Sequence, residues 1–220
     1  MRTYEIVQEE SPESPREWDN VGTMICWHRN YTLGDEQPDM TPDEFKDKLV
    51  SQHTNSISNW VDLAYPDADD DDPEAVEFND RLVSEWLEQN TVMLPLYLYD
   101  HSGITMRTSS FSCNWDSGQV GFIYCTKEKA MKELGCSENE WRERATDCLE
   151  GEVETYDQYL TGDVYGYIIK DEQGEEEESC WGFFGYDYCE QEAKAICDWR
   201  DSSGNAEVSK EAQDAEPAEA

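Results

Sequence analysis

Apolar and polar positions along the chain follow two periods, one typical of strands and one typical of helices. Short apolar, β-prone runs over 21–33, 91–111 and 118–125 predict strands, and the 91–111 run reads as two strands joined at 100–103. Residues 163–185 predict a hairpin of two aromatic strands around a glycine turn rich in glutamate. Because the strands cluster as hairpins, we expect an α+β fold with a mainly antiparallel sheet, packed against several amphipathic helices.

Helical segments begin at recognisable signals. Thr41, followed by a proline and by Glu44 three residues later, predicts a capping box and a short helix. The next helix is expected over 74–90, with these apolar residues on one side: Val76, Leu82, Val83, Trp86 and Leu87. A later helical region breaks near Gly135, and its second piece is expected over about 137–160.

The expected organisation is one domain between two tails. Residues 1–19 read as a flexible N-terminal lead-in, 20–203 as a single α+β domain that ends in a helix over about 187–200, and 204–220 as a disordered acidic tail. There is no apolar run of signal-peptide or membrane-span length, so we expect a soluble protein of the cytoplasm. In that compartment the eight cysteines are expected to be reduced thiols.

Charge changes this picture most. The chain has 52 acidic and 16 basic residues, a formal net charge of -36. Residues 201–220 hold six acids and one lysine, a net of -5, so the remaining -31 belongs to the first 200 residues. A body of this charge repels nucleic acid and anionic membranes and attracts basic protein surfaces. Direct binding to nucleic acid or to a membrane is therefore not expected.

The acidic residues of 137–160 fall on one side of the predicted helix. At 100° per residue they lie within an arc of about 100°, about 25 Å long, which Arg142 and Arg144 do not interrupt. We call this set the acidic stripe: Glu140, Glu143, Asp147, Glu150, Glu154 and Asp157. Apolar residues occupy the opposite arc: Trp141, Ala145, Cys148, Leu149, Val153, Tyr156 and Leu160. The stripe is therefore expected on the outside of a folded helix.

A second acidic cluster precedes the 74–90 helix and consists of Asp69, Asp70, Asp71 and Asp72. It resembles the start of a calcium loop, but Asp72 stands where the turn glycine belongs and Phe78 where the bidentate glutamate belongs. The cysteines contain no C-x-x-C pair for zinc. We therefore expect no metal and no cofactor.

One thiol is a candidate for catalysis. Cys113 lies in a Gly/Ser-rich stretch, and His101 or His28 is the available base, although a buried structural cysteine explains the same pattern. Asp100, His101 and Ser102 cannot act as a triad, because consecutive strand residues point to opposite faces.

Three stretches carry a resemblance: "EWDNVGTMICWHRNYTLGDE", "LPLYLYDHSGITMRTSSFSCNWDSGQVGFIY" and "YDQYLTGDVYGYIIK". They are similar to a family of acidic proteins carried by phages and other mobile elements, and the resemblance covers most of 17–190. It implies no catalytic residues. It implies a setting in which small acidic proteins act against the host's nucleic-acid-binding defences, including restriction enzymes and CRISPR complexes.

The favoured interpretation is a non-enzymatic DNA mimic, an inhibitor that binds the basic nucleic-acid-binding surface of a host protein or complex through the acidic stripe and 69–72. Ordinary solvated helix faces mix signs, because Glu–Lys pairs stabilise a helix and like-charged pairs destabilise it. Two alternatives stay open. One is a salt-adapted, halophilic domain of unrelated function, in which high salt screens the repulsion. The other is a thiol enzyme centred on Cys113.

Overall fold

The computed structural model describes residues 2–69, 71–113 and 115–214, with side chains described as far as residue 202. It confirms the α+β class, with helices packed on antiparallel sheets. The chain divides into two compact units, a larger one over Trp18–Glu154 and a smaller one made of Met1–Glu17 and Thr155–Ala220. We expected a single domain over 20–203. The difference arises because the smaller unit joins the two ends of the chain in a sheet of their own.

The larger unit is built on a four-stranded antiparallel sheet in the order β2-β5-β3-β4. Its strands are β2 (Thr23–Cys26), β3 (Thr91–Asp100), β4 (Ile104–Arg107) and β5 (Ser117–Thr126). β3 and β4 form the expected hairpin, in which Ser102 and Gly103 take positive φ at the turn. Gly121 of β5 pairs with Cys26 of β2, and a Cβ at this glycine would lie 1.9 Å from the carbonyl oxygen of Ile25. The two strands can approach this closely because position 121 has no side chain.

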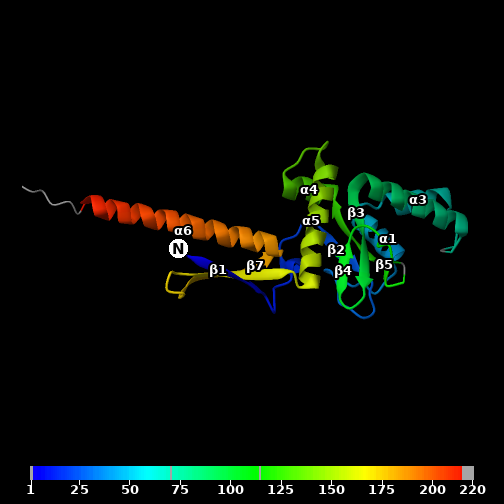
Figure 1. Ribbon diagram of the computed structural model, residues 1–220. Coiled ribbons are helices and arrows are strands. Elements are labelled where there is room, and N and C mark those ends of the chain that lie inside the picture. The colour runs from blue at the N-terminus through cyan, green and yellow to red at the C-terminus, as the bar shows by residue number, and fades with distance from the viewer. Residues whose placement is uncertain (1, 70, 114, 215–220) are drawn as a thin grey trace, which may run out of the picture. The chain divides into compact units, whose positions relative to one another are not determined.

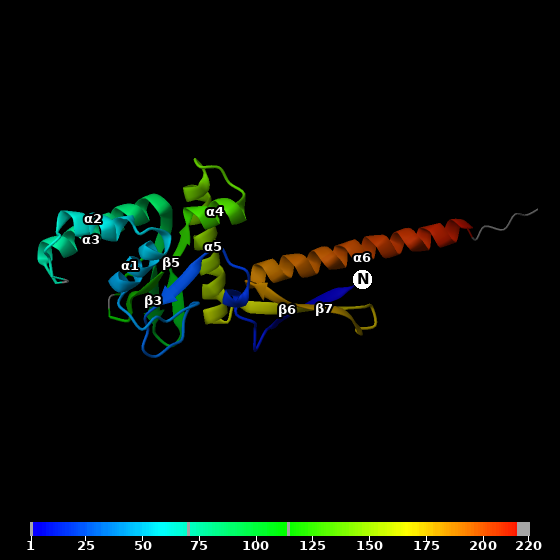
Figure 2. The same cartoon turned by 180° about the vertical axis from the view of Figure 1, so that it is seen from behind.

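Helices cover both faces of this sheet (Figures 1 and 2). On one face lie α1 (Pro42–His53) and α3 (Pro73–Asn90), and on the other lies α5 (Trp141–Thr161), which runs on into the smaller unit. The core on the α1 and α3 side consists of Ile25, Phe45, Leu49, Val50, Val83, Leu87 and Phe122. Of the apolar side expected for 74–90, Val83 and Leu87 are buried, whereas Val76 is exposed.

The capping signals place the helix ends correctly. The Thr41 hydroxyl accepts from the Glu44 amide at 3.3 Å, and the Glu44 carboxylate accepts from the Thr41 amide at 2.7 Å, which is the expected capping box. α4 (Lys127–Leu134) ends at Gly135, which has a left-handed φ of 59°. One helix, α2 (Ser56–Ala64), was not predicted, although Ile57, Trp60 and Val61 have helical spacing.

The smaller unit has a three-stranded antiparallel sheet in the order β1-β6-β7. β6 (Val164–Lys170) and β7 (Glu176–Phe184) form the predicted hairpin, and β1 (Thr3–Gln8) pairs with the other edge of β6. α6 (Tyr186–Asp214) packs on one face of this sheet, and together they bury Tyr167, Ile169, Cys189, Ala193 and Cys197. A short 3-10 turn, η1, covers Pro15–Glu17.

Both predicted tails need correction. Residues 3–8 of the expected lead-in form β1, because Tyr4 and Ile6 alternate with polar residues and pack against the smaller core. Arg2 extends this anchor, since its guanidinium donates to the carboxylates of Glu177 and Asp201, both at 3.1 Å. At the other end, α6 continues to Asp214, beyond the helix end expected near 200. Residues 215–220 lie outside the described residues.

The contact at Gly121 generates a stability prediction. Gly121→Ala should lower the free energy of unfolding by about 2–3 kcal/mol, because the new methyl group would collide with the Ile25 carbonyl and separate β2 from β5. Gly118→Ala is the matched control in the same strand, where a Cβ meets nothing within 4 Å. Urea unfolding measures both. Equal midpoints for the two variants would contradict the close packing of β2 on β5.

Candidate functional site

The burial pattern of α5 determines which of its side chains reach solvent. Five residues of the expected apolar arc are buried: Trp141, Ala145, Leu149, Val153 and Tyr156. Cys148 and Leu160 of that arc are half-buried. The helix that was expected over about 137–160 is confirmed, with its first i to i+4 backbone bond from the Trp141 amide to the Ser137 carbonyl at 3.0 Å.

The acidic stripe lies on the outer side of this helix. Glu143, Asp147, Glu150 and Glu154 are exposed. No ion pair involves these four carboxylates within the described residues. Asp157 is half-buried and belongs to the smaller unit, so the exposed part of the stripe runs from Glu140 to Glu154.

Two basic residues of α5 were expected to lie outside the stripe. Arg142 is turned away from it, because its guanidinium donates to the backbone carbonyls of Thr91, at 2.9 Å, and Glu88. Arg144 is exposed, and its charge contributes only the weakest of the influences on Glu140. The row of carboxylates is therefore not neutralised by its own helix.

The first carboxylate of the stripe also has a structural role. Glu140 accepts from the hydroxyl and, at 3.3 Å, from the amide of Ser137, which is one of the two reciprocal contacts of a capping box. These hydrogen bonds, the hydroxyl first, lower the pKa of the Glu140 carboxyl below its ordinary value. Glu140 thus caps α5 and carries charge at its N-terminal end.

A carboxylate outside the stripe holds a neighbouring loop. Glu152 is half-buried and accepts from the amides of Val21, at 2.8 Å, and Gly22, at 3.0 Å. The spacing along α5 shows that Glu152 lies off the acidic arc, but the sequence gives no signal for its loop partners, which are 130 and 131 positions away. The negative charge of Glu152 therefore stabilises the loop at 21–22.

The aspartate cluster divides into different environments. Asp69 and Asp71 are exposed, whereas Asp72 is the N-cap of α3 and accepts from the amides of Glu74, at 2.9 Å, and Ala75, at 3.3 Å. Asp70 lies outside the described residues. The cluster therefore combines surface charge with a helix cap.

Asp69 also lines a hollow of about 330 Å³ beside α2 and α3, which the sequence did not reveal. Three further carboxylates contribute, from Asp47 on α1, Asp62 on α2 and Asp80 on α3. Desolvation raises the pKa of the Asp47 carboxyl above its ordinary value, and the nearby charges of Asp80 and Asp43 add to this, against a hydrogen bond from Asn79 at 3.3 Å. This acidic hollow brings together residues that are far apart in sequence.

Among the described residues no hydrogen bond joins the candidate thiol directly to a histidine. The Cys113 sulfur lies 3.8 Å from the Asp116 carboxylate, and His101 Nδ1 lies 3.4 Å from the same carboxylate. His28 instead accepts from the amides of Asn30 and Tyr31 and stacks on the Tyr31 ring. The Asp116 carboxylate, rather than an imidazole, is thus the group that contacts the sulfur.

Other features of the described residues bear on the candidate chemistry. None of the eight cysteines, all of which lie within the described residues, forms a disulfide bond. No group of three or more His, Cys, Asp or Glu side chains among the described residues has the geometry of a metal site. Across the same part of the chain, none of the helices combines the length and the apolar character needed to span a bilayer.

The fold and this surface define an α+β protein with an outward row of carboxylates on one helix. No family model, curated protein or solved structure matches the chain. The resemblance to phage-borne acidic proteins thus stays an expectation, and the function has to be argued from the surface itself.

The capping geometry predicts a measurable change at Glu140. Ser137→Ala should raise the pKa of the Glu140 carboxyl toward its ordinary value of 4.5, because the strongest stabilising hydrogen bond is lost. Since the folded pKa is lowered, the stabilisation is fully present above the unfolded value and is lost as the pH falls through the folded value.

Carboxyl-resolved NMR titration measures this shift. Glu44 serves as the internal control, because Thr41 lowers its pKa in an equivalent capping box that the substitution does not touch. An unchanged Glu140 titration in the variant would contradict the cap.

Proposed function

We propose that this protein is a non-enzymatic DNA mimic that binds the basic nucleic-acid-binding surface of a partner protein, in the manner of an anti-restriction or anti-CRISPR inhibitor. The observation that carries the proposal is the row of exposed carboxylates at Glu143, Asp147, Glu150 and Glu154 on one side of α5, which form no ion pair with any described side chain. A formal net charge of -36 supports it, because a basic groove would attract the whole molecule.

The spacing of the carboxylates is comparable to that of a DNA strand. Residues three or four apart on a helix are separated by about 5 Å along its axis, and one DNA strand presents a phosphate every ~3.4 Å. DNA-binding proteins gain much of their affinity by neutralising such a row with Lys and Arg. Because α5 is held by a buried apolar side, the backbone that carries its carboxylates needs little further ordering on binding.

Salt adaptation is the second candidate, and one observation favours it. Exposed carboxylates also occur far along the chain from the stripe, as at Glu172 and Glu175 in the turn between β6 and β7. A halophilic surface spreads its charge in this way. At molar salt the Debye length is about 3 Å, so repulsion between charges farther apart than this is largely screened.

Charge reversal on α5 tests the proposal. The triple variant Glu143→Lys, Asp147→Lys and Glu150→Lys should keep its fold, because all three side chains are exposed and form no ion pair with any described side chain, and should lose binding to the partner. The partner is captured from host lysate at low salt on the immobilised wild-type protein. It should be a nucleic-acid-binding protein that duplex DNA displaces.

The matched control applies the same change of charge elsewhere. Glu10, Glu13 and Glu175 are exposed residues of the smaller unit, and their replacement by lysine should weaken binding far less. If the stripe variant retains the partner, or if duplex DNA fails to displace it, the DNA-mimic proposal is wrong.

Thermal unfolding distinguishes mimicry from salt adaptation. A DNA mimic of a mesophilic host should stay folded at about 50 mM KCl and gain only modestly in Tm at about 2 M, where the repulsion is screened. Loss of the fold at the lower concentration would favour the halophilic alternative.

A further inference from the structure

The helix α2 exposes large apolar side chains to solvent. Of its nine residues, none is buried. Trp60 is 60% exposed and Leu63 is 75% exposed, and the two lie about 60° apart on the helix, on one side. Exposed large apolar side chains that lie together on one side of a helix mark an interaction surface more often than isolated ones do.

This surface is hollowed beside Trp60. A groove of about 290 Å³ lies between α2 and α3, with Ile57 and Trp60 from α2 on one side. Its other side is a single face of α3, because the lining residues are spaced at i, i+3, i+4 and i+7: Leu82, Glu85, Trp86 and Gln89. These four positions extend about 10 Å along α3.

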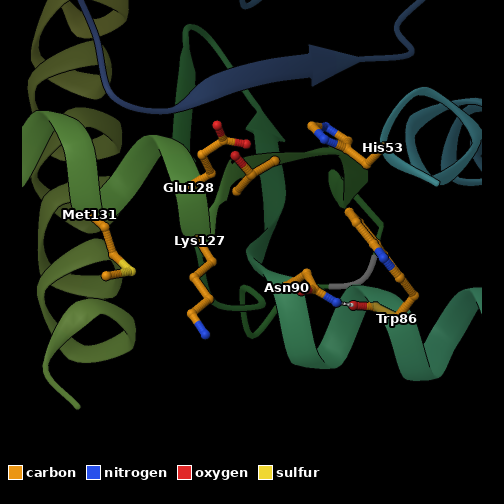
Figure 3. Close-up of a pocket in the computed structure, with 7 residues that line it drawn as sticks. His53, Trp86, Asn90, Lys127, Glu128 and Met131 are labelled. Atoms are coloured by element: carbon orange, nitrogen blue, oxygen red, sulfur yellow. Dashed lines mark hydrogen bonds between the residues drawn. The ribbon is translucent and has the colours of Figure 1, made fainter. Parts of the chain in front are cut away.

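Trp86 also lines a second hollow, of about 470 Å³, at the C-terminal end of α3. Figure 3 shows Trp86 and His53 on one side of it, and Lys127, Glu128 and Met131 of α4 on the other. The rings of His53 and Trp86 stack, with centroids 5.4 Å apart. The two hollows share the Trp86 side chain, so apolar groups are available along α3 from Leu82 to its last turn.

Negative charge surrounds these apolar groups. Residues 42–90 hold 14 Asp and Glu against 3 Lys and Arg. Glu85 lies within the groove, and the acidic hollow on the other side of α2 contains Asp62 and Asp80. A ligand that combines an apolar ridge with positive charge would satisfy both features.

We propose that the surface formed by α2 and α3 binds an amphipathic, cationic α-helix of a partner protein. Large apolar side chains of that helix pack on Trp60 and Trp86, and its lysines and arginines pair with Glu85 at the groove and are attracted by the net negative charge of 42–90. The inference goes beyond the proposed function, because it uses none of the carboxylates of α5 and holds whether or not the partner binds nucleic acid.

The negative charge of this surface favours a cationic helix as its ligand over a second copy of the chain. Two such surfaces brought together would place the carboxylates of 42–90 against each other, and like charges across an interface cost several kcal/mol. The acidic segment 201–220 is repelled for the same reason. A cationic helix, in contrast, is attracted to these carboxylates.

Three synthetic 18-residue peptides test the inference. The first has Leu and Trp at i, i+3, i+4 and i+7 with Lys elsewhere, the second replaces its Lys by Glu, and the third replaces its Leu and Trp by Ser. Binding to the full-length protein is measured by calorimetry at about 150 mM KCl, where weak surface attraction is screened. Only the first peptide should bind tightly.

Variants then locate the binding site. Trp60→Ala with Leu63→Gln should weaken binding of the first peptide by at least about tenfold, as expected for aromatic anchors, while circular dichroism and Tm stay unchanged because both side chains are exposed. Trp115→Ala is the matched control in the same unit, since Trp115 is also exposed, and it should bind as the wild type does.

The outcomes separate this inference from the DNA-mimic proposal. If the Trp60/Leu63 variant binds the first peptide as tightly as the wild type does, the inference is overturned. Loss of binding only in the α5 triple variant would overturn it as well and leave the DNA-mimic proposal standing. A wild-type dimer in light scattering that Trp60→Ala dissociates would show that a second copy covers this surface, again against the inference.

Discussion

The packing of the apolar side of α5 against the sheet of the larger unit fixes where the acidic stripe lies. Leu149 and Ile123 are so close to Gly22 that a Cβ there would lie 2.4 Å and 2.7 Å from their side chains. A helix packed this tightly cannot rotate without opening a cavity. The carboxylates on its other side therefore remain in solvent.

A comparison of free energies explains how the fold tolerates the repulsion between the carboxylates of α5. Like charges at i, i+4 on an exposed helix cost about 0.2–0.5 kcal/mol per pair. Burying a leucine or valine side chain contributes about 1.5–3 kcal/mol, and α5 buries Leu149 and Val153 among others. The apolar side outweighs the acidic side by a wide margin. Charge on α5 is thus free to be selected for binding, and the same holds for the acidic surroundings of Trp60 on α2.

Sequence reasoning succeeded where the signal was local. The capping box at Thr41, the break at Gly135 and the spacing of the stripe all lie within a few residues, and the structure contains each of them. It failed where the signal was distant or short. β1 was missed because its partner β6 lies about 160 positions away, and α2 was missed because nine residues offer few repeats of a helical pattern.

The same distinction applies to the candidate site. The outward direction of Glu143, Asp147 and Glu150 follows from helical spacing alone. The capping role of Asp72, the loop contact of Glu152 and the acidic hollow around Asp47 depend on tertiary packing, which the sequence does not reveal. A carboxylate count therefore overstates the charge that is available to a partner.

Carbodiimide labelling of carboxylates, read by mass spectrometry in the free protein and in its complex with the partner, tests the central claim most directly. We predict rapid modification of Glu143, Asp147, Glu150 and Glu154 in the free protein and protection of all four in the complex. Slow modification in the free protein, or equal modification in both states, would contradict the claim that these side chains form the binding surface.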